Sequence, residues 1–178
     1  MQSKVVLDIP EGINFKHEGQ NAIVSGPKGE IKRKLFHPRV RIMQKENKIT
    51  FHAEKISKKE KCLIGTLSKH IGNMFKGVNE EFVYKLKICS GHFPMTVAKE
   101  GDNIVIKNFL GEKVPRKSRI MEDVKVEIKG DEIIVNSINK EFAGQTAANI
   151  EQSTRITNKD RRKFQDGCYI TVKAGKEV

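Results

Sequence analysis

The sequence has no apolar run of 18 residues, and this absence argues against a membrane-spanning helix. It also lacks a basic-hydrophobic signal segment and a lipidation motif, so we expect no membrane partner. Cysteine is scarce: Cys62, Cys89 and Cys168 are odd in number, far apart and never in a C-x-x-C pair. We therefore expect no disulfide framework and no zinc knuckle, but three reduced thiols in a reducing, cytoplasmic compartment.

Patterns typical of catalysis and cofactor binding are absent as well. The five histidines are scattered, without the H-E-x-x-H spacing of a zinc site. Residues 26–29 resemble a phosphate-binding loop, but Glu30 follows where such a loop needs Lys and then Ser or Thr. There is no G-x-G-x-x-G fingerprint, no G-x-S-x-G elbow and no carboxylate pair on apolar strands. We expect no enzyme activity, no catalytic residues, no cofactor and no metal.

Acidic residues are outnumbered. The 178 residues include 34 Lys plus Arg and 22 Asp plus Glu, which give a net charge of +12. Such a surplus favours a polyanionic partner, because each phosphate contact releases condensed counterions. Since no membrane feature accompanies the charge, nucleic acid is the favoured partner.

The most informative pattern is an internal repeat. A run of five residues recurs with its order and spacing intact: Glu18, Gly19, Asn21, Gly29 and Glu30 return as Glu100, Gly101, Asn103, Gly111 and Glu112. A repeat this long predicts two tandem, duplicated α+β domains, each a small, mostly antiparallel sheet packed against one main helix. We place the domains at residues 1–90 and 91–178, and each is long enough for one modest core.

Alternating β-branched segments and turn residues predict the strands. In the first copy we expect strands at 5–7, 21–25, 30–35, 40–43, 49–52 and 82–88, with turns at 10–12, 18–19, 26–29 and 46–47. In the second copy we expect them at 95–98, 103–107, 113–118, 124–128, 132–135 and 167–172.

Each copy also predicts one helix. The first begins at a capping box, Ser57 to Glu60, and should end near Gly77. The second begins near Asn139 and buries the smaller side chains Phe142, Ala143, Thr146, Ala147 and Ile150, which would let it lie closer to its sheet.

Positive charge gathers in three places: Lys28, Lys32, Arg33, Lys34, Arg39 and Arg41; Lys113, Arg116, Lys117 and Arg119; and Arg155, Lys159, Arg161, Arg162 and Lys163. The last group lies in residues 154–166, which have no counterpart in the first copy and are too charged to form a core. Arg, Asn158 and aromatic side chains together suit phosphate clamping and base stacking. We favour Phe164 as an anchor of this segment, and Tyr169 remains open between anchoring and stacking.

Several motifs along the chain are distinctive: Asn108 to Lys113, Asn73-Met74 with Lys76-Gly77-Val78, His92-Phe93-Pro94, Asn158-Lys159-Asp160, Arg162-Lys163-Phe164 and Asp166-Gly167-x-Tyr169. Together they resemble the large-subunit ribosomal protein six family, the L-six family, over essentially the whole chain. The segment from Asn158 to Tyr169 is similar to the archaeal and eukaryotic branch, and the short termini resemble archaeal members. Cys168 departs from the family, which usually has an aliphatic residue there.

The resemblance implies a two-domain protein that binds large-subunit rRNA, chiefly through its second domain, near the sarcin-ricin loop and the base of the factor-binding stalk. It implies neighbouring large-subunit proteins and nearby translation factors as further partners, in the cytoplasm. The motif positions expected to touch rRNA are Lys113, Asn158, Lys159, Arg162 and Lys163, with Arg116, Lys117, Arg119, Arg155 and Arg161 added on charge alone.

Two other function classes are compatible with the residues alone. A free-standing RNA-binding regulatory module would show the same charge and a similar fold plan. A nucleic-acid-processing enzyme would need a metal cluster or an acid-base pair, and neither can be assigned in the sequence.

Overall fold

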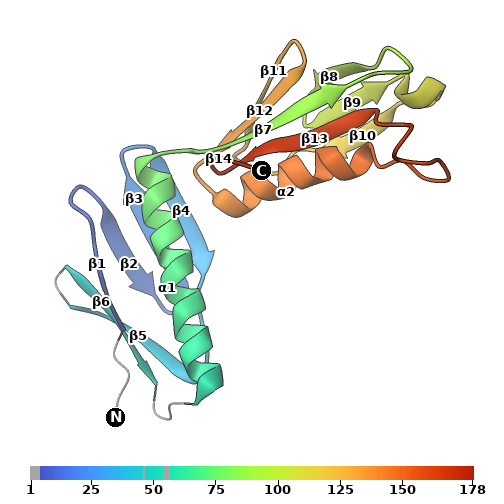
Figure 1. Ribbon diagram of the computed structural model, residues 1–178. Coiled ribbons are helices and arrows are strands. Elements are labelled where there is room, and N and C mark those ends of the chain that lie inside the picture. Colours follow the sequence, from blue (N-terminus) through green and yellow to red (C-terminus); the bar gives the residue numbers. More distant parts are fainter. Residues whose placement is uncertain (1–4, 46, 54–56) are drawn as a thin grey trace. The chain divides into compact units, whose positions relative to one another are not determined.

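The computed structural model describes residues 5–45, 47–53 and 57–178, so residue 46 of the predicted turn at 46–47 lies outside the described residues. The chain divides into two compact units, Met1–Glu81 (unit 1) and Phe82–Val178 (unit 2). Each unit is α+β and packs one long helix against antiparallel strands (Figure 1).

Unit 1 contains two three-stranded sheets and helix α1. The sheets have the orders β2-β3-β4 and β1-β6-β5. The elements are β1 (Val5–Asp8), β2 (Asn14–Glu18), β3 (Asn21–Gly26), β4 (Gly29–Lys34), β5 (Val40–Lys45), β6 (Lys48–Ala53) and α1 (Lys58–Asn79).

Unit 2 has a three-stranded sheet, β10-β9-β8, and a five-stranded sheet, β11-β12-β7-β13-β14. The elements are β7 (Phe82–Cys89), β8 (Thr96–Glu100), β9 (Asn103–Lys107), the 3-10 turn η1 (Phe109–Gly111), β10 (Arg116–Arg119), β11 (Lys125–Lys129), β12 (Glu132–Ser137), α2 (Lys140–Ser153), β13 (Gly167–Lys173) and β14 (Lys176–Glu177). Its core lies between α2 and the strands, and Leu86, Ile133, Val135 and Ile150 are fully buried there.

The two units share one plan, which confirms the duplicated α+β fold. The order β1-β6-β5 corresponds to β7-β12-β11, and β2-β3-β4 corresponds to β8-β9-β10, all with antiparallel pairing. A hydrogen bond outside the ladders recurs as well: Ile9 N–H donates to the Asn47 carbonyl over 2.9 Å, and Ile88 N–H to the Asp131 carbonyl over 2.7 Å. Among the described residues of unit 1, no strand corresponds to β13 or β14.

The repeated Glu-Gly-x-Asn motif forms the same hairpin turn in both units. Glu18 pairs with Asn21 and Glu100 with Asn103, so two residues form each loop. The first of them is a glycine with positive φ, +61° in unit 1 and +60° in unit 2. This conformation is disfavoured for side chains with a Cβ, which explains why the repeat includes a glycine at this point.

One strand that the sequence assigned to the first copy belongs to the second copy. Residues 82–88 do form a strand, β7, but it pairs with β12 and β13 of unit 2. Its position next to β12 matches that of β1 next to β6, so β7 opens the second copy. Alternation of apolar residues predicted the strand correctly but gave no information about its partner.

Helix α1 starts as predicted and ends later. Ser57 accepts the Lys59 N–H and forms the capping box with Glu60. The helix continues past Gly77 to Asn79, because its last turn packs on the turn between β3 and β4. There Lys28 N–H donates to the Val78 carbonyl over 2.9 Å, so a neighbouring turn satisfies a carbonyl that the helix end leaves open.

Helix α2 is preceded by its predicted cap, Asn139, whose side chain accepts the Glu141 N–H over 3.0 Å. Of the predicted apolar stripe, Phe142 is half-buried and the others are buried: Ala143, Thr146, Ala147 and Ile150.

We expect Gly26→Ala to destabilise unit 1 by roughly 1–3 kcal/mol, the usual cost of overpacking. An alanine Cβ would lie 2.8 Å from Val78 Cγ2 and 3.2 Å from the Val78 carbonyl oxygen. Gly65→Ala is the matched control, since nothing lies within 4 Å of its Cβ position, and alanine should there stabilise α1 by about 0.5–1 kcal/mol. Urea unfolding followed by circular dichroism measures both changes, and equal effects would contradict the close approach at Gly26.

Candidate nucleic-acid interface

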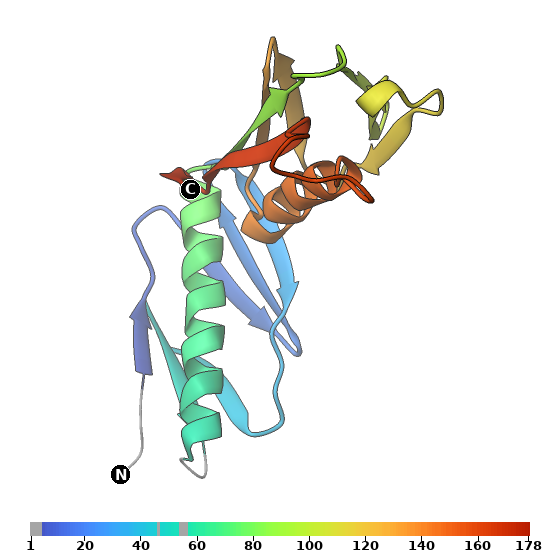
Figure 2. The same cartoon turned by 45° about the vertical axis from the view of Figure 1, so that its right-hand side comes forward.

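Two basic segments meet at one end of unit 2. The first is the connection through η1 into β10, and the second is residues 155–163, which lie between α2 and β13. Figures 1 and 2 both place η1 and this second segment at the end of the unit where α2 finishes. We call residues 155–163 the basic segment.

Successive residues of strand β10 point to opposite faces of the sheet. Lys117 and Arg119 are exposed, whereas Ser118 between them is buried under α2, as the twofold alternation of a strand requires. Lys113 is exposed in the connection that precedes the strand. The side chains of these three cations make no hydrogen bond or ion pair with the rest of the described chain.

Arg116 lies on the inner face of β10, and most of its donors bind within the protein. Its guanidinium donates to both carboxylate oxygens of Glu112, over 2.8 and 2.6 Å. A further nitrogen donates to the carbonyls of Ser153 (2.8 Å) and Arg155 (3.1 Å), and the group lies 4.2 Å from the Phe109 ring centroid. Arg116 thereby joins the first basic segment to the end of α2 and the start of the second.

Glu112 completes this join. Its hydrogen bonds and ion pair with Arg116 hold the pKa of the Glu112 carboxyl below its ordinary value, so the carboxylate stays charged at neutral pH. The bidentate arrangement fixes the orientation of the guanidinium as well as its position.

The base of the basic segment is closed by hydrogen bonds between α2 and β13. Cys168 N–H donates to Thr154 Oγ1 over 2.9 Å, and Ile170 N–H donates to Glu151 Oε1 over 3.0 Å. Thr154 is buried at the end of the helix. The chain therefore leaves α2 and returns to the sheet at a fixed distance.

A turn around Asp160 forms the tip. The Asp160 carbonyl accepts the N–H groups of Lys163 (3.1 Å) and Phe164 (2.9 Å), and its carboxylate accepts the Arg162 N–H over 3.0 Å. The Arg162 guanidinium also pairs with this carboxylate at 3.2 Å, yet its side chain is 91% exposed. Asn158 enters the turn with a left-handed φ of +58°, a conformation that asparagine adopts more readily than most residues.

Phe164 anchors the segment, as predicted. Its ring is half-buried against the core of unit 2 and lies 4.7 Å from the His92 ring, centroid to centroid. The Lys159 ammonium lies 4.7 Å from the same centroid, within the range of a cation–π contact. The one apolar side chain between residues 157 and 165 is thus the one that ties the segment to the fold.

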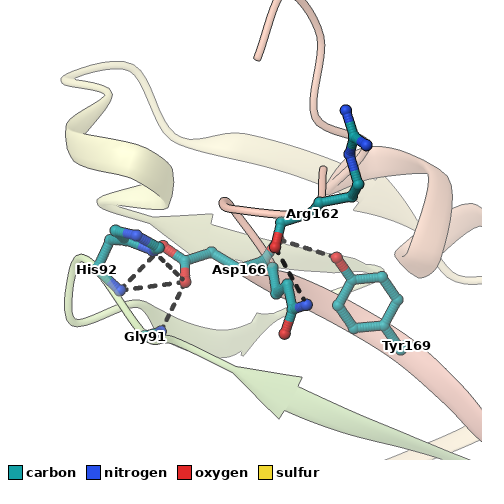
Figure 3. Close-up of polar contacts among 6 residues, drawn as sticks. Gly91, His92, Arg162, Asp166 and Tyr169 are labelled. Atoms are coloured by element: carbon teal, nitrogen blue, oxygen red, sulfur yellow. Dashed lines mark hydrogen bonds and ion pairs between the residues drawn. The ribbon is translucent and has the colours of Figure 1, made fainter. Parts of the chain in front are cut away.

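A buried carboxylate provides the second tie (Figure 3). Asp166 is only 2% exposed and accepts the Gly91 N–H at 2.6 Å and the His92 N–H at 3.2 Å, with the His92 ring 3.4 Å away. Burial by itself raises the pKa of Asp166, but these hydrogen bonds outweigh it and hold the pKa below the ordinary value of 3.8. Two motifs far apart in the sequence, His92-Phe93-Pro94 and Asp166-Gly167, therefore meet here.

The ten predicted contact residues thus all lie in these two segments, and the structure brings the segments together through Arg116. Arg155, Lys159, Arg161 and Lys163 are exposed like Lys113, Lys117 and Arg119. Sequence reasoning missed the positioning roles of Glu112 and Asp166, although both occur in the motifs that carried the family resemblance. It also added Arg116 to the expected contacts on charge alone, whereas the guanidinium binds mainly within the protein, on the same face of β10 as the buried Ser118.

Two of the basic residues of unit 1 contact residues of helix α1. Arg39 pairs with Glu60 at 3.1 Å, and the hydrogen bonds from Ser57 and Arg39 lower the pKa of Glu60 to about 2. Arg33 lies 3.5 Å from the His70 ring nitrogen. These two arginines therefore contact the residues at and along α1.

Other kinds of site find little support in the described chain. Among the described residues, no three His, Cys, Asp or Glu side chains gather as metal ligands. Neither α1 nor α2, the helices searched in the described residues, is long and apolar enough to cross a membrane. Cys62, Cys89 and Cys168 are free, and burial raises the pKa of the Cys168 thiol to about 12.

Comparison with known proteins gives consistent matches. The family model described as ribosomal protein L6 matches twice, at residues 9–81 and 93–167. The chain is 44% identical to the large ribosomal subunit protein uL6 of Methanococcus vannielii over 170 residues, 96% of this chain and 93% of the relative. It is 45% identical to the large ribosomal subunit protein uL6 of Methanobrevibacter smithii over 167 residues, 94% of each.

We expect Asp166→Asn to destabilise unit 2 by about 1–3 kcal/mol at pH 7, the cost of leaving buried N–H donors poorly paired. Because the folded-state pKa is lowered, the carboxylate contributes its stability above the ordinary pKa of 3.8 and loses it as the pH falls through the folded value. The difference between variant and parent should therefore shrink below about pH 4.

Denaturant unfolding at a series of pH values measures this difference. Glu127→Gln is the control, because Glu127 forms an exposed pair with Lys129 and should change stability by no more than about 0.5 kcal/mol. If Asp166→Asn lowers the free energy of unfolding by the same amount at every pH, the charge of Asp166 does not stabilise unit 2.

Proposed function

The chain belongs to the ribosomal protein L6 family, and from this premise we propose that it is a structural constituent of the large ribosomal subunit that binds large-subunit rRNA chiefly through unit 2. Both named relatives are large-subunit proteins of archaeal methanogens. Our proposal places the contact near the sarcin-ricin loop and the base of the factor-binding stalk. There the protein supports subunit assembly and translation in the cytoplasm, beside neighbouring large-subunit proteins and translation factors.

One observation carries the assignment to unit 2. Two cationic segments that are about 40 residues apart in sequence are joined by Arg116 into one surface, and the copy in unit 1 has no counterpart of the basic segment. Phosphate contacts set the register of a protein on RNA, so the cations that make these contacts must lie at fixed positions. The ties at Phe164 and Asp166, together with the buried Ile156, provide fixed positions for a segment whose other residues are polar.

The ten residues divide into two roles under this proposal. Those that contact RNA are exposed: Lys113, Lys117, Arg119, Arg155, Asn158, Lys159, Arg161, Arg162 and Lys163. Arg116 acts mainly through its neighbours, since four of its donor contacts are made inside the protein. The chemistry is binding alone, and the family is one of structural ribosomal proteins.

Co-sedimentation tests the placement in the ribosome. An integral constituent stays with large subunits in high salt, whereas a transient RNA-binding module is stripped as its phosphate contacts are screened. Loss of the protein from subunits at moderate salt would favour the free-standing module.

We expect Arg162→Glu with Lys163→Glu to weaken rRNA binding without unfolding unit 2. Losing two phosphate contacts should reduce the salt dependence of log Kd by about 0.9 per contact on duplex RNA, and by about 0.7 on single strands. Both side chains are exposed, so stability should change by no more than about 0.5 kcal/mol. The measurement is a salt titration against transcribed large-subunit rRNA of Methanococcus vannielii, with a thermal melt of each variant.

The matched control is Lys58→Glu with Lys59→Glu. These lysines are exposed in the first turn of α1 and carry the same charge change. Equal losses from both pairs, or no loss from the Arg162 and Lys163 pair, would mean that the RNA-binding surface lies elsewhere on the chain.

A further inference from the structure

A hollow opens beside the basic segment, between the end of α2 and the start of β13. Its volume is about 270 Å3, and its lining is largely apolar. It is lined by Glu151, Gln152, Thr154, Arg155, Ile156, Arg161 and Tyr169. This volume lies below the roughly 300 Å3 at which pockets begin to hold drug-sized ligands, so the hollow suits one group smaller than such a ligand.

Tyr169 forms an aromatic wall that the chain holds in place. Its hydroxyl donates to the Asp166 carbonyl over 3.3 Å (Figure 3), and the side chain is half-buried. Gly167 makes this position possible, because a Cβ there would lie 3.3 Å from the Tyr169 hydroxyl, and its φ of +150° also favours glycine. Since the ring is fixed before any ligand arrives, stacking on it costs little side-chain entropy.

The charges around the hollow favour a nucleobase over a phosphate inside it. Glu151 lines it, and the negative charge of its carboxylate would repel an anion. One of its oxygens, Oε1, already accepts the Ile170 N–H, and the other can accept a hydrogen bond from an amino group of a base. Arg155 and Arg161 also line it and are exposed, and so can bind the phosphates that accompany a base. Sequence-specific RNA recognition commonly combines an aromatic ring, arginine and an unstacked base in this way.

We propose that this hollow binds one unstacked base of the RNA, stacked on Tyr169. The inference rests on the proposed rRNA-binding function and adds a base contact to it. Of the two alternatives for Tyr169 it takes stacking, while Phe164 and Asp166 anchor the segment.

The variants Tyr169→Leu and Tyr169→Phe test the stacking. Leucine keeps apolar bulk but removes the π face, so affinity for transcribed large-subunit rRNA of Methanococcus vannielii should fall between about fivefold and about a hundredfold. Phenylalanine keeps the face, and the hydroxyl that it lacks binds the Asp166 carbonyl and not the RNA, so its affinity should stay close to that of the parent chain. Neither variant removes a phosphate contact, so the salt dependence of binding should be that of the parent.

A spectroscopic readout separates stacking from loss of structure. The chain has two tyrosines, and Tyr84 is buried in the core of unit 2. Labelling with 3-fluorotyrosine therefore gives two fluorine resonances, and RNA should shift that of Tyr169 and leave that of Tyr84 in place. Inorganic polyphosphate at the same ionic strength should shift neither.

Each of the following results would overturn the base site. In the first, the labelled chain binds rRNA with the Tyr169 resonance unmoved. In the second, Tyr169→Leu binds like the parent. In the third, polyphosphate shifts the Tyr169 resonance as RNA does, which would make the hollow an anion site.

If the parent chain fails to bind rRNA at all, the proposed function itself fails, and the base site fails with it. A Tyr169 shift seen with intact large subunits but not with naked rRNA would assign the hollow to a protein neighbour and overturn the base site.

Discussion

The basic segment depends on contacts with the rest of unit 2 for its structure, and this dependence determines how one end of unit 2 is built. It carries five cations and Asp160, whereas the only large apolar side chains in it or next to it are those of Ile156 and Phe164. Like charges repel, and so few apolar atoms cannot offset the backbone entropy lost on ordering. The buried Asp166 carboxylate supplies what is missing, because it binds the main chain of Gly91 and His92 and fixes the far end of the segment.

Duplication explains why the second copy could acquire such a segment. Both units share one strand order, and β13, β14 and the basic segment are additions to this common plan in unit 2. The additions in unit 2, η1 and the segment after α2, meet at one end through Arg116. A site grafted onto a finished scaffold can change its surface without changing the core, which is how one fold comes to carry different functions.

Local signals in the sequence predicted local structure well. The capping box at Ser57, the cap at Asn139 and the two Glu-Gly-x-Asn hairpins are each determined by residues within four positions of one another. Features that depend on a distant partner were missed or misplaced. The strand at 82–88 was assigned to the wrong copy because its alternation does not name its neighbour, and α1 passes Gly77 because a turn about 50 residues earlier caps its end.

In the candidate site, too, the sequence indicated local features and missed those that depend on a distant partner. The positive charge of a residue can be read from the sequence, but the group that it binds cannot. Composition locates cations, yet it cannot separate a guanidinium that binds RNA from one that holds the protein together. Arg116 and Arg162 both pair with a carboxylate, but the contacts of Arg116 cross to the end of α2, whereas the Arg162 side chain remains 91% exposed over its own turn. The geometry of the donors, and not the charge, therefore decides which arginine positions the surface and which one remains available to a phosphate.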